Sequence, residues 1–444
     1  MKMKTGLLMG VGTAILLAAV PVRASKVTMT VDLTNPLVES GAKRTVVLKV
    51  ALQAAEREQA SKRPPVNMAL VIDKSGSMQG ERIQQAREAA LAAVDRLRDD
   101  DIISVVAFDD NVTVLVPATK ASSRAEIRRG IEQIQAGGST ALFAGTSKGA
   151  AEVRKFLERE QVNRVILLSD GQANVGPSSP GALGELGGSL MKDGISATTI
   201  GLGLGYNEDL MVRLARESDG NHSFVENAND LVSIFDREFG EAMSVIAQDV
   251  QIRIDCGAGV RPLRTLGRPS EISGQTVITQ LNQLYGGQER YLLLEVEVPA
   301  NEPDTTVELA SVTATFRDLG TNEQNALKEQ AQVQVTASRE AVEAKEDKKV
   351  VSDFVLLEAA VVNQQAVQLR DEGRVEEARE LLKGNIQRLD EVAQKEDMPA
   401  EAKQQLKRFS ADNQADSESL ENSSWKGRRK SMRDVQYKIE TQKY

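Results

Sequence analysis

Short apolar runs alternate with stretches of helical periodicity throughout residues 66–247, and this alternation is the feature that most limits the fold. The run Met68–Ile72 is apolar at every position, which is typical of a strand buried on both faces. The next stretch, Gln79–Arg98, repeats apolar residues at helical spacing. Buried strands that alternate with helices predict a doubly wound, Rossmann-like α/β sheet.

Residues with oxygen-bearing side chains follow two of these strands. The segment Asp73–Met78 comes directly after the first strand and places a carboxylate and two hydroxyls at alternate positions. Asp170 follows the expected strand Arg164–Leu168, and the loop that contains Thr140 precedes an expected helix. Because such sheets bind ligands at the carboxyl ends of their strands, we expect these loops to meet at one edge.

These oxygen donors suit a hard divalent cation. The predicted metal ligands are Asp73, Ser75, Ser77, Thr140 and Asp170. The residues expected to form a ligand-binding rim around the ion are Gly76, Met78, Gly138, Ser139 and Gly171. Two carboxylates balance the charge of a dication and leave an octahedral position for an external carboxylate. Oxygen ligation with few charges favours Mg²⁺, with Mn²⁺ or Ca²⁺ as alternatives.

Three segments resemble the metal-ion-dependent adhesion site of the von Willebrand factor type A family: Asp73–Ser77, Gly138–Thr140 and Ser169–Gly171. The resemblance covers residues 66–247. It implies direct contact with the ion for Ser75, Ser77 and Thr140, and contact directly or through water for Asp73 and Asp170. It also implies a protein partner that presents an Asp or Glu side chain to the ion.

In outline, the chain is similar to bacterial exported proteins that carry this domain and to the inter-alpha-trypsin inhibitor heavy chains, in which β-rich segments flank the α/β domain. Strand-like patterns such as Val27–Val31 and Tyr291–Val298 agree with such flanks. We expect one β-sandwich built from both flanks, with separate small β units as the alternative. The expected division of the chain is a signal peptide at 1–24, an N-terminal β segment at 25–65, the α/β domain at 66–247, the β-sandwich domain at 248–338, a helical hairpin or small helical domain at 339–412 and a polar to basic tail at 413–444.

The N-terminus has the pattern of an export signal. Two lysines precede an apolar stretch, Leu7–Val20, and Val22 and Ala24 fit the small-residue rule for cleavage after Ala24. An uncleaved anchor is the alternative, because Thr5–Val22 is just long enough to span a bilayer. We expect an exported protein of the bacterial periplasm or cell surface, with no transmembrane segment in the mature chain.

Composition limits the class of function. A net charge of −9 gives the chain no overall positive field to attract nucleic acid. The single histidine, His222, is the one imidazole available to a nucleophilic mechanism, and no G-x-S-x-G or P-loop motif accompanies it. We therefore expect a metal-dependent binding module for adhesion or assembly, not an enzyme. The alternatives are an envelope structural protein in which the metal only stabilises a loop, and a metal-dependent hydrolase; the oligomeric state stays open.

Overall fold

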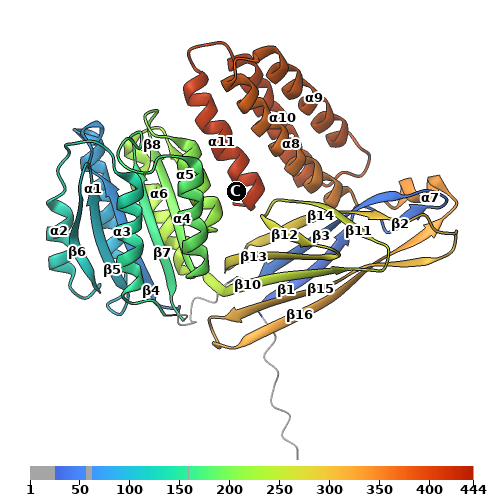
Figure 1. Ribbon diagram of the computed structural model, residues 1–444, viewed down its shortest axis with the longest axis horizontal. Helices are drawn as coiled ribbons and strands as arrows, with labels where there is room; N and C mark the ends of the chain where they lie inside the picture. Colours follow the sequence, from blue (N-terminus) through green and yellow to red (C-terminus); the bar gives the residue numbers. More distant parts are fainter. Residues whose placement is uncertain (1–25, 57–62, 159, 444) are drawn as a thin grey trace, which may run out of the picture.

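The computed structural model describes residues 26–56, 63–158 and 160–443, which form three parts (Figure 1). An α/β domain is followed along the chain by most of a β-sandwich and then by a helical bundle. The bundle packs on the sandwich, and the last helix lies between the bundle and the α/β domain (Figure 1). The expected signal peptide, 1–24, lies outside the described residues.

The α/β domain contains a six-stranded sheet in the order β6-β5-β4-β7-β8-β9. β6 is antiparallel to β5, and the other neighbouring strands are parallel. Its strands are β4 (Val66–Asp73), β5 (Ile102–Phe108), β6 (Val112–Lys120), β7 (Val162–Ser169), β8 (Ile195–Leu202) and β9 (His222–Val225). Every residue of β4, β5, β7 and β8 is buried, and most of these residues are apolar, as expected for strands covered on both faces. The predicted doubly wound, Rossmann-like sheet is confirmed.

Helices cover both faces of this sheet. Side chains of α1, α2 and α6 form the core on one face, and side chains of α3, α4 and α5 form the core on the other. The helices are α1 (Glu81–Asp95), α2 (Arg124–Glu132), α3 (Leu142–Arg154), α4 (Pro180–Lys192), α5 (Glu208–Glu217) and α6 (Leu231–Met243), with short 3₁₀ helices η1 (Gly76–Met78) and η2 (Ala228–Asp230). The register pairs Asp73 with Phe108 and Ile72 with Leu168, so β4, β5 and β7 end at the same edge.

The β-sandwich consists of two sheets, with strand orders β1-β3-β14-β11 and β12-β13-β10-β15-β16-β2. The strands before the α/β domain are β1 (Val27–Leu33), β2 (Leu37–Glu39) and β3 (Arg44–Ala54). The strands after it are β10 (Val245–Cys256), β11 (Arg261–Leu266), β12 (Ser270–Ser273), β13 (Thr276–Tyr285), β14 (Glu289–Val298), β15 (Thr306–Asp318) and β16 (Gln324–Thr336). Leu48 and Leu292 from one sheet share a core with Val250 and Val312 from the other. Both flanks therefore contribute to one sandwich, and the α/β domain is inserted between β3 and β10.

A helical bundle covers the outer face of the first sheet. Its helices are α8 (Lys348–Asp371), α9 (Val375–Ala393), α10 (Ala400–Ser419) and α11 (Trp425–Thr441), whereas the short helix α7 (Arg339–Ala344) packs against β2 and β16. Val47 and Leu293 of the sheet share a core with Leu356, Leu389 and Phe409 of the bundle. Within the described residues, α8 is the one helix that is long and apolar enough to cross a membrane, but 61% of that apolar window is buried inside the protein.

The last helix lies in a segment for which the sequence left a solvated tail or a terminal helix open. The polar to basic tail expected at 413–444 forms the end of α10 and helix α11, which packs against α5, β9 and α8. Arg429 of α11 pairs with Asp209 of α5 at 2.7 Å and with Asp371 of α8 at 2.8 Å. Positive charge of this segment therefore meets carboxylates of the same chain, and these ion pairs stabilise its packing on the protein.

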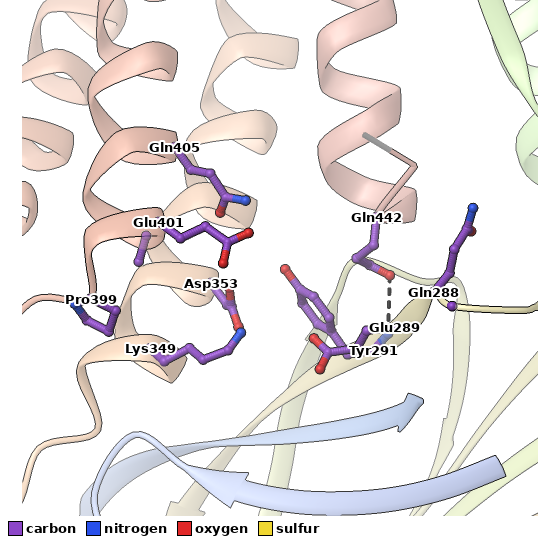
Figure 2. Close-up of a pocket in the computed structure, with 11 residues that line it drawn as sticks. Gln288, Glu289, Tyr291, Lys349, Asp353, Pro399, Glu401, Gln405 and Gln442 are labelled. Atoms are coloured by element: carbon purple, nitrogen blue, oxygen red, sulfur yellow. Dashed lines mark hydrogen bonds between the residues drawn. The ribbon is translucent and has the colours of Figure 1, made fainter. Parts of the chain in front are cut away.

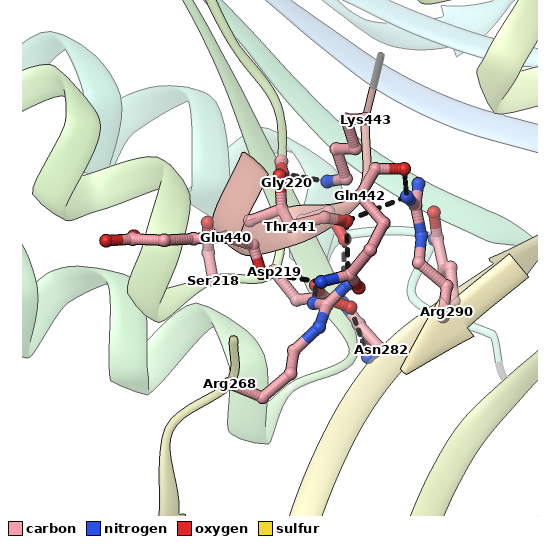
Figure 3. A network of polar contacts seen from close by, with 12 residues as sticks. Ser218, Asp219, Gly220, Arg268, Asn282, Arg290, Glu440, Thr441, Gln442 and Lys443 are labelled. Atoms are coloured by element: carbon pink, nitrogen blue, oxygen red, sulfur yellow. Dashed lines mark hydrogen bonds and ion pairs between the residues drawn. The ribbon is translucent and has the colours of Figure 1, made fainter. Parts of the chain in front are cut away.

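The end of α11 and the segment after it join the sandwich to the α/β domain (Figure 3). Arg290 of β14 donates a hydrogen bond to the main-chain oxygen of Thr441 at 2.8 Å. Lys443 Nζ donates to the main-chain oxygen of Gly220, in the loop before β9. All three parts of the protein are thus connected at this one place.

A polar cleft of about 420 Å³ lies between the sandwich and the bundle (Figure 2). Its lining includes Glu289, Tyr291, Asp353, Glu401 and Gln442. Its lining residues come from the sandwich, the bundle and the segment after α11, so the cleft is separate from the carboxyl edge of the α/β sheet.

Candidate metal centre

Three loops meet at the carboxyl edge of the α/β sheet: one after β4, one before α3 and one after β7. The Gly76 N–H donates to the Gly138 oxygen at 2.9 Å, which joins the first loop to the second. The Thr140 N–H donates to Asn174 Oδ1 at 2.8 Å, which joins the second loop to the third. These bonds hold together the three segments singled out in the sequence.

Side-chain oxygens from these loops lie in hydrogen-bond contact. Ser77 Oγ donates to Asp170 Oδ1 at 2.6 Å and lies 3.0 Å from Ser75 Oγ. Asp73 Oδ1 accepts from the Ser75 N–H at 2.8 Å, and Asp73 Oδ2 accepts from Ser169 Oγ at 2.5 Å. Four of the five predicted metal ligands therefore lie together.

Gly171 shows that the fifth predicted ligand, Thr140, belongs to the same group. A Cβ atom placed on Gly171 would lie 2.7 Å from Thr140 Oγ1, 3.5 Å from Asp73 Oδ2 and 3.5 Å from Ser75 Oγ. Oxygens from the first two loops thus surround one point beside the third loop, and the lack of a side chain at Gly171 keeps that point open. We call Asp73, Ser75, Ser77, Thr140 and Asp170 the oxygen set.

Two carboxylates of the oxygen set are fully buried, Asp73 and Asp170. Burial is the main reason that the pKa of Asp73 is raised to about 6; hydrogen bonds from Ser169 and Ser75 oppose the shift, and the charge of Asp170 adds to it. A dication about 4 Å from a carboxylate attracts it by roughly 8 kcal/mol at an effective dielectric constant of about 20, before desolvation costs. A bound dication would therefore favour the ionised form of Asp73.

The oxygen set fits a small hard cation. Across the part of the chain that the structure describes, no three His, Cys, Asp or Glu side chains are grouped to hold a metal ion, so an ion here must rely on hydroxyl oxygens as well. Mg²⁺ takes oxygen ligands at about 2.0–2.1 Å in an octahedron, in which adjacent ligands are about 2.9 Å apart. The 3.0 Å between Ser75 Oγ and Ser77 Oγ agrees with that spacing.

The residues predicted for the rim differ in how far they are exposed. Gly76 and Gly138 are exposed, Ser139 is half-buried, and Gly171 is buried beside the oxygen set. Met78 is a correction, because its side chain is fully buried in the core of the α/β domain. The 3₁₀ turn η1 curls the backbone so that this apolar side chain points inward, where it packs with the core.

Sequence reasoning missed Arg82 and Asn174 and gave no separate role to Ser169. Arg82, the second residue of α1, pairs with Asp170 and donates to the main-chain oxygen of Ser77 at 3.3 Å. Its position in the first turn of a helix that begins beside the metal loop was the available signal. Asn174 lies in an aperiodic loop, where no local pattern indicates which backbone group its side chain meets.

His222, the residue on which a hydrolase would depend, lies elsewhere. Its Nδ1 is 2.8 Å from Thr199 Oγ1, and its ring lies near the rings of Tyr206 and Tyr437. Burial is the main cause that lowers the pKa of His222 to about 4. This histidine is a neutral residue of the domain core and makes its contacts away from the oxygen set.

Comparison with known proteins identifies the α/β domain. Residues 67–237 match the family model of the von Willebrand factor type A domain. The protein sll0103 of Synechocystis is 29% identical over 259 residues, which are 56% of this chain and 61% of that protein. Inter-alpha-trypsin inhibitor heavy chain H2 of Mus musculus is 31% identical over 196 residues, which are 42% of this chain and 21% of that protein. The chain thus spans less than two thirds of either relative.

A solved structure, von Willebrand factor type A from Catenulispora acidiphila, shares the fold with a TM-score of 0.71. The match covers 94% of this chain and 96% of that chain at 17% identity, so it speaks for the fold alone. The family match, the relatives and the fold agree with the six-stranded sheet described above. Residues 67–237 of this chain are a von Willebrand factor type A domain.

Proposed function

We propose that this chain is a metal-dependent protein-binding module for adhesion or assembly. The oxygen set would hold Mg²⁺, with Mn²⁺ or Ca²⁺ as alternatives, and the bound ion would take an Asp or Glu side chain of a partner protein. A bound ion would supply a Lewis-acid contact to that carboxylate. The protein supplies the buried aspartates that hold the ion and the exposed edge that the partner approaches.

One observation carries this proposal: the point beside Gly171 that is surrounded by Thr140 Oγ1, Asp73 Oδ2 and Ser75 Oγ. Five side chains do not complete an octahedron of six ligands by themselves, so an external oxygen ligand has a place. Ser77 is exposed, whereas Asp73 and Asp170 are fully buried, so the accessible side of the oxygen set is the side of Ser77.

The comparisons support a binding role in general terms. Domains of this family commonly serve protein interactions, and the relatives include an inter-alpha-trypsin inhibitor heavy chain. An enzymatic role has less support, because Asp73 and Asp170 are both engaged in the oxygen set and His222 is buried and neutral. We therefore propose a module that is not an enzyme.

We further propose that the protein is exported and acts in the periplasm or at the cell surface of a bacterium. The support is the sequence of residues 1–24, with its lysines, its apolar stretch and its small residues before the expected cleavage site. N-terminal sequencing of the protein from fractionated cells tests this. A mature N-terminus at Ser25 in the envelope fraction is the expected result, and an intact N-terminus in the cytoplasm would contradict it.

The metal-binding proposal is tested with Asp73→Ala. Mg²⁺ binding is measured by titration calorimetry for the wild type, for Asp73→Ala and for a matched control, Asp236→Ala, which removes an exposed carboxylate from α6 of the same domain. We expect the wild type and Asp236→Ala to bind Mg²⁺ and Asp73→Ala to lose binding while circular dichroism shows that its fold survives. Equal Mg²⁺ binding by all three proteins would contradict the proposed site.

Partner binding needs a second measurement. Affinity capture from envelope extracts is compared for the wild type and Asp73→Ala in Mg²⁺ and in EDTA. We expect the wild type to retain proteins in Mg²⁺ that it does not retain in EDTA. Asp73→Ala is expected to retain them in neither condition. If Mg²⁺ raises the melting temperature of the wild type and the captured proteins are the same in EDTA, the metal stabilises a loop and the protein is an envelope structural component instead.

A further inference from the structure

Arg82 places a positive charge directly on the proposed metal site. Its Nη1 forms an ion pair with Asp170 Oδ2 and donates to the main-chain oxygen of Ser77 at 3.3 Å. A Cβ atom on Gly203, in the loop after β8, would lie 3.1 Å from Arg82 Nη2, so the guanidinium also lies against that loop. The side chain of Arg82 is 40% exposed.

Both oxygens of Asp170 accept hydrogen bonds from side chains. Oδ1 accepts from Ser77 Oγ at 2.6 Å, and Oδ2 accepts from Arg82. The two buried carboxylates and the one guanidinium together carry a single negative charge, so a bound dication would leave a single positive charge. Without Arg82, the same dication would leave the site neutral.

We propose that Arg82 is a built-in counter-cation that weakens metal uptake and makes it depend on an acidic partner. This inference rests on the proposed function. The guanidinium repels the dication, which lowers the affinity of the free protein for metal. The remaining positive charge attracts a carboxylate at the open coordination position. Because coupling between two ligands is reciprocal, an acidic partner raises the affinity for metal by the same factor as the metal raises the affinity for the partner.

The exposure of the residues places this charge where it has that effect. Asp73, Ser75, Thr140 and Asp170 are buried, whereas the Arg82 side chain remains accessible beside Ser77. A partner that approaches the oxygen set from the side of Ser77 therefore meets the guanidinium as well as the ion. Arg82 favours a partner whose acidic side chain lies in a negatively charged surface.

The first measurement is Mg²⁺ affinity by titration calorimetry at constant ionic strength. We expect Arg82→Gln to bind Mg²⁺ roughly tenfold more tightly than the wild type, which corresponds to about 1.4 kcal/mol. Arg82→Lys keeps the charge and is expected to stay near the wild type. Arg87→Gln is the matched control and is expected to change nothing. It removes a guanidinium of the same helix, which donates to the Glu132 main-chain oxygen at 3.4 Å. Arg82→Met is a second neutral variant in case the glutamine variant does not fold.

The second measurement tests the coupling with acetate as the probe, replaced by chloride at equal ionic strength in the control. Acetate is expected to raise the Mg²⁺ affinity of the wild type more than that of Arg82→Gln. A residue that only positions Asp170 would give the opposite first result, with weaker Mg²⁺ binding in both neutral variants.

The outcomes separate this inference from the proposed function. If the wild type and all variants fail to bind Mg²⁺, the proposed metal site is wrong and the inference is wrong with it. If the wild type binds Mg²⁺ and the neutral variants bind it equally or more weakly, the metal site stands and the role given to Arg82 is wrong.

Discussion

Asp219 and Arg268 form a buried ion pair, with 2.6 Å between Oδ1 and Nη1, that joins the von Willebrand factor type A domain to the β-sandwich. The other oxygen of Asp219 accepts from the Asn282 N–H of the sandwich at 2.7 Å. Arg268 also donates to the main-chain oxygen of Thr441 at 3.1 Å, at the end of α11 (Figure 3). A single buried carboxylate thus connects the domain, the sandwich and the last helix.

Asp219→Asn is predicted to destabilise the protein by about 3 kcal/mol, because it leaves the Arg268 guanidinium buried without a counter-charge. Asparagine tolerates the positive φ of 49° at this position, so backbone strain does not contribute. Urea denaturation measures the loss. Arg339→Met removes an exposed ion pair with Glu343 and is the control, with no measurable change expected. A stability loss in Asp219→Asn no larger than in Arg339→Met would show that the buried pair does not hold the parts together.

Gly171→Ala is predicted to weaken Mg²⁺ binding by at least roughly tenfold, since the new methyl group would lie 2.7 Å from Thr140 Oγ1 and displace that oxygen. Calorimetric titration with Mg²⁺ provides the measurement. Gly188→Ala in α4 is the control, because its Cβ meets nothing within 4 Å. That control is expected to keep wild-type Mg²⁺ binding and to gain about 0.5–1 kcal/mol of stability from helix propensity. Wild-type metal affinity in Gly171→Ala would mean that Thr140 is not a ligand.

His222 is predicted to make the protein less stable as the pH falls. Burial is the main cause that lowers the pKa of His222 from 6.5 to about 4, so the unfolded chain binds a proton more readily than the folded protein does. The stability is fully present above pH 6.5 and falls by about 3 kcal/mol as the pH drops to about 4. Urea denaturation between these pH values should show a steeper loss in the wild type than in His222→Gln, which does not titrate. Equal slopes would contradict the neutral, buried state of His222.

Cys256 is predicted to react slowly with thiol reagents in the native protein. Its side chain is buried, and burial is the main cause that raises the pKa of the thiol to about 11, so little thiolate exists near neutral pH. We expect Ellman's reagent to modify the native protein at least about tenfold more slowly than the urea-unfolded protein. Rapid modification of the native protein would show that the end of β10 opens readily.

Much of the fold follows from local patterns. The apolar runs at 68–72 and 165–168 lie in β4 and β7, because a strand covered by helices on both faces is apolar at most positions. The positions of Asp73 and Asp170 directly after these strands then place both carboxylates at one edge of the sheet, since parallel strands all end on the same side. The inward turn of Met78 was missed, because a three-residue 3₁₀ turn carries too little periodicity to show which side chain faces the core.

The chain alone was enough to predict the layered α/β domain and the oxygen donors at its edge, because strand burial and turn chemistry depend on neighbouring residues. The ion pair of Arg82 with Asp170, the burial of α11 and the junction at Asp219 were decided only by the folded molecule. These features bring together residues far apart in the sequence. Whether a basic segment such as 425–441 stays in solvent or packs depends on which carboxylates the rest of the fold presents to it, and no local pattern carries that information.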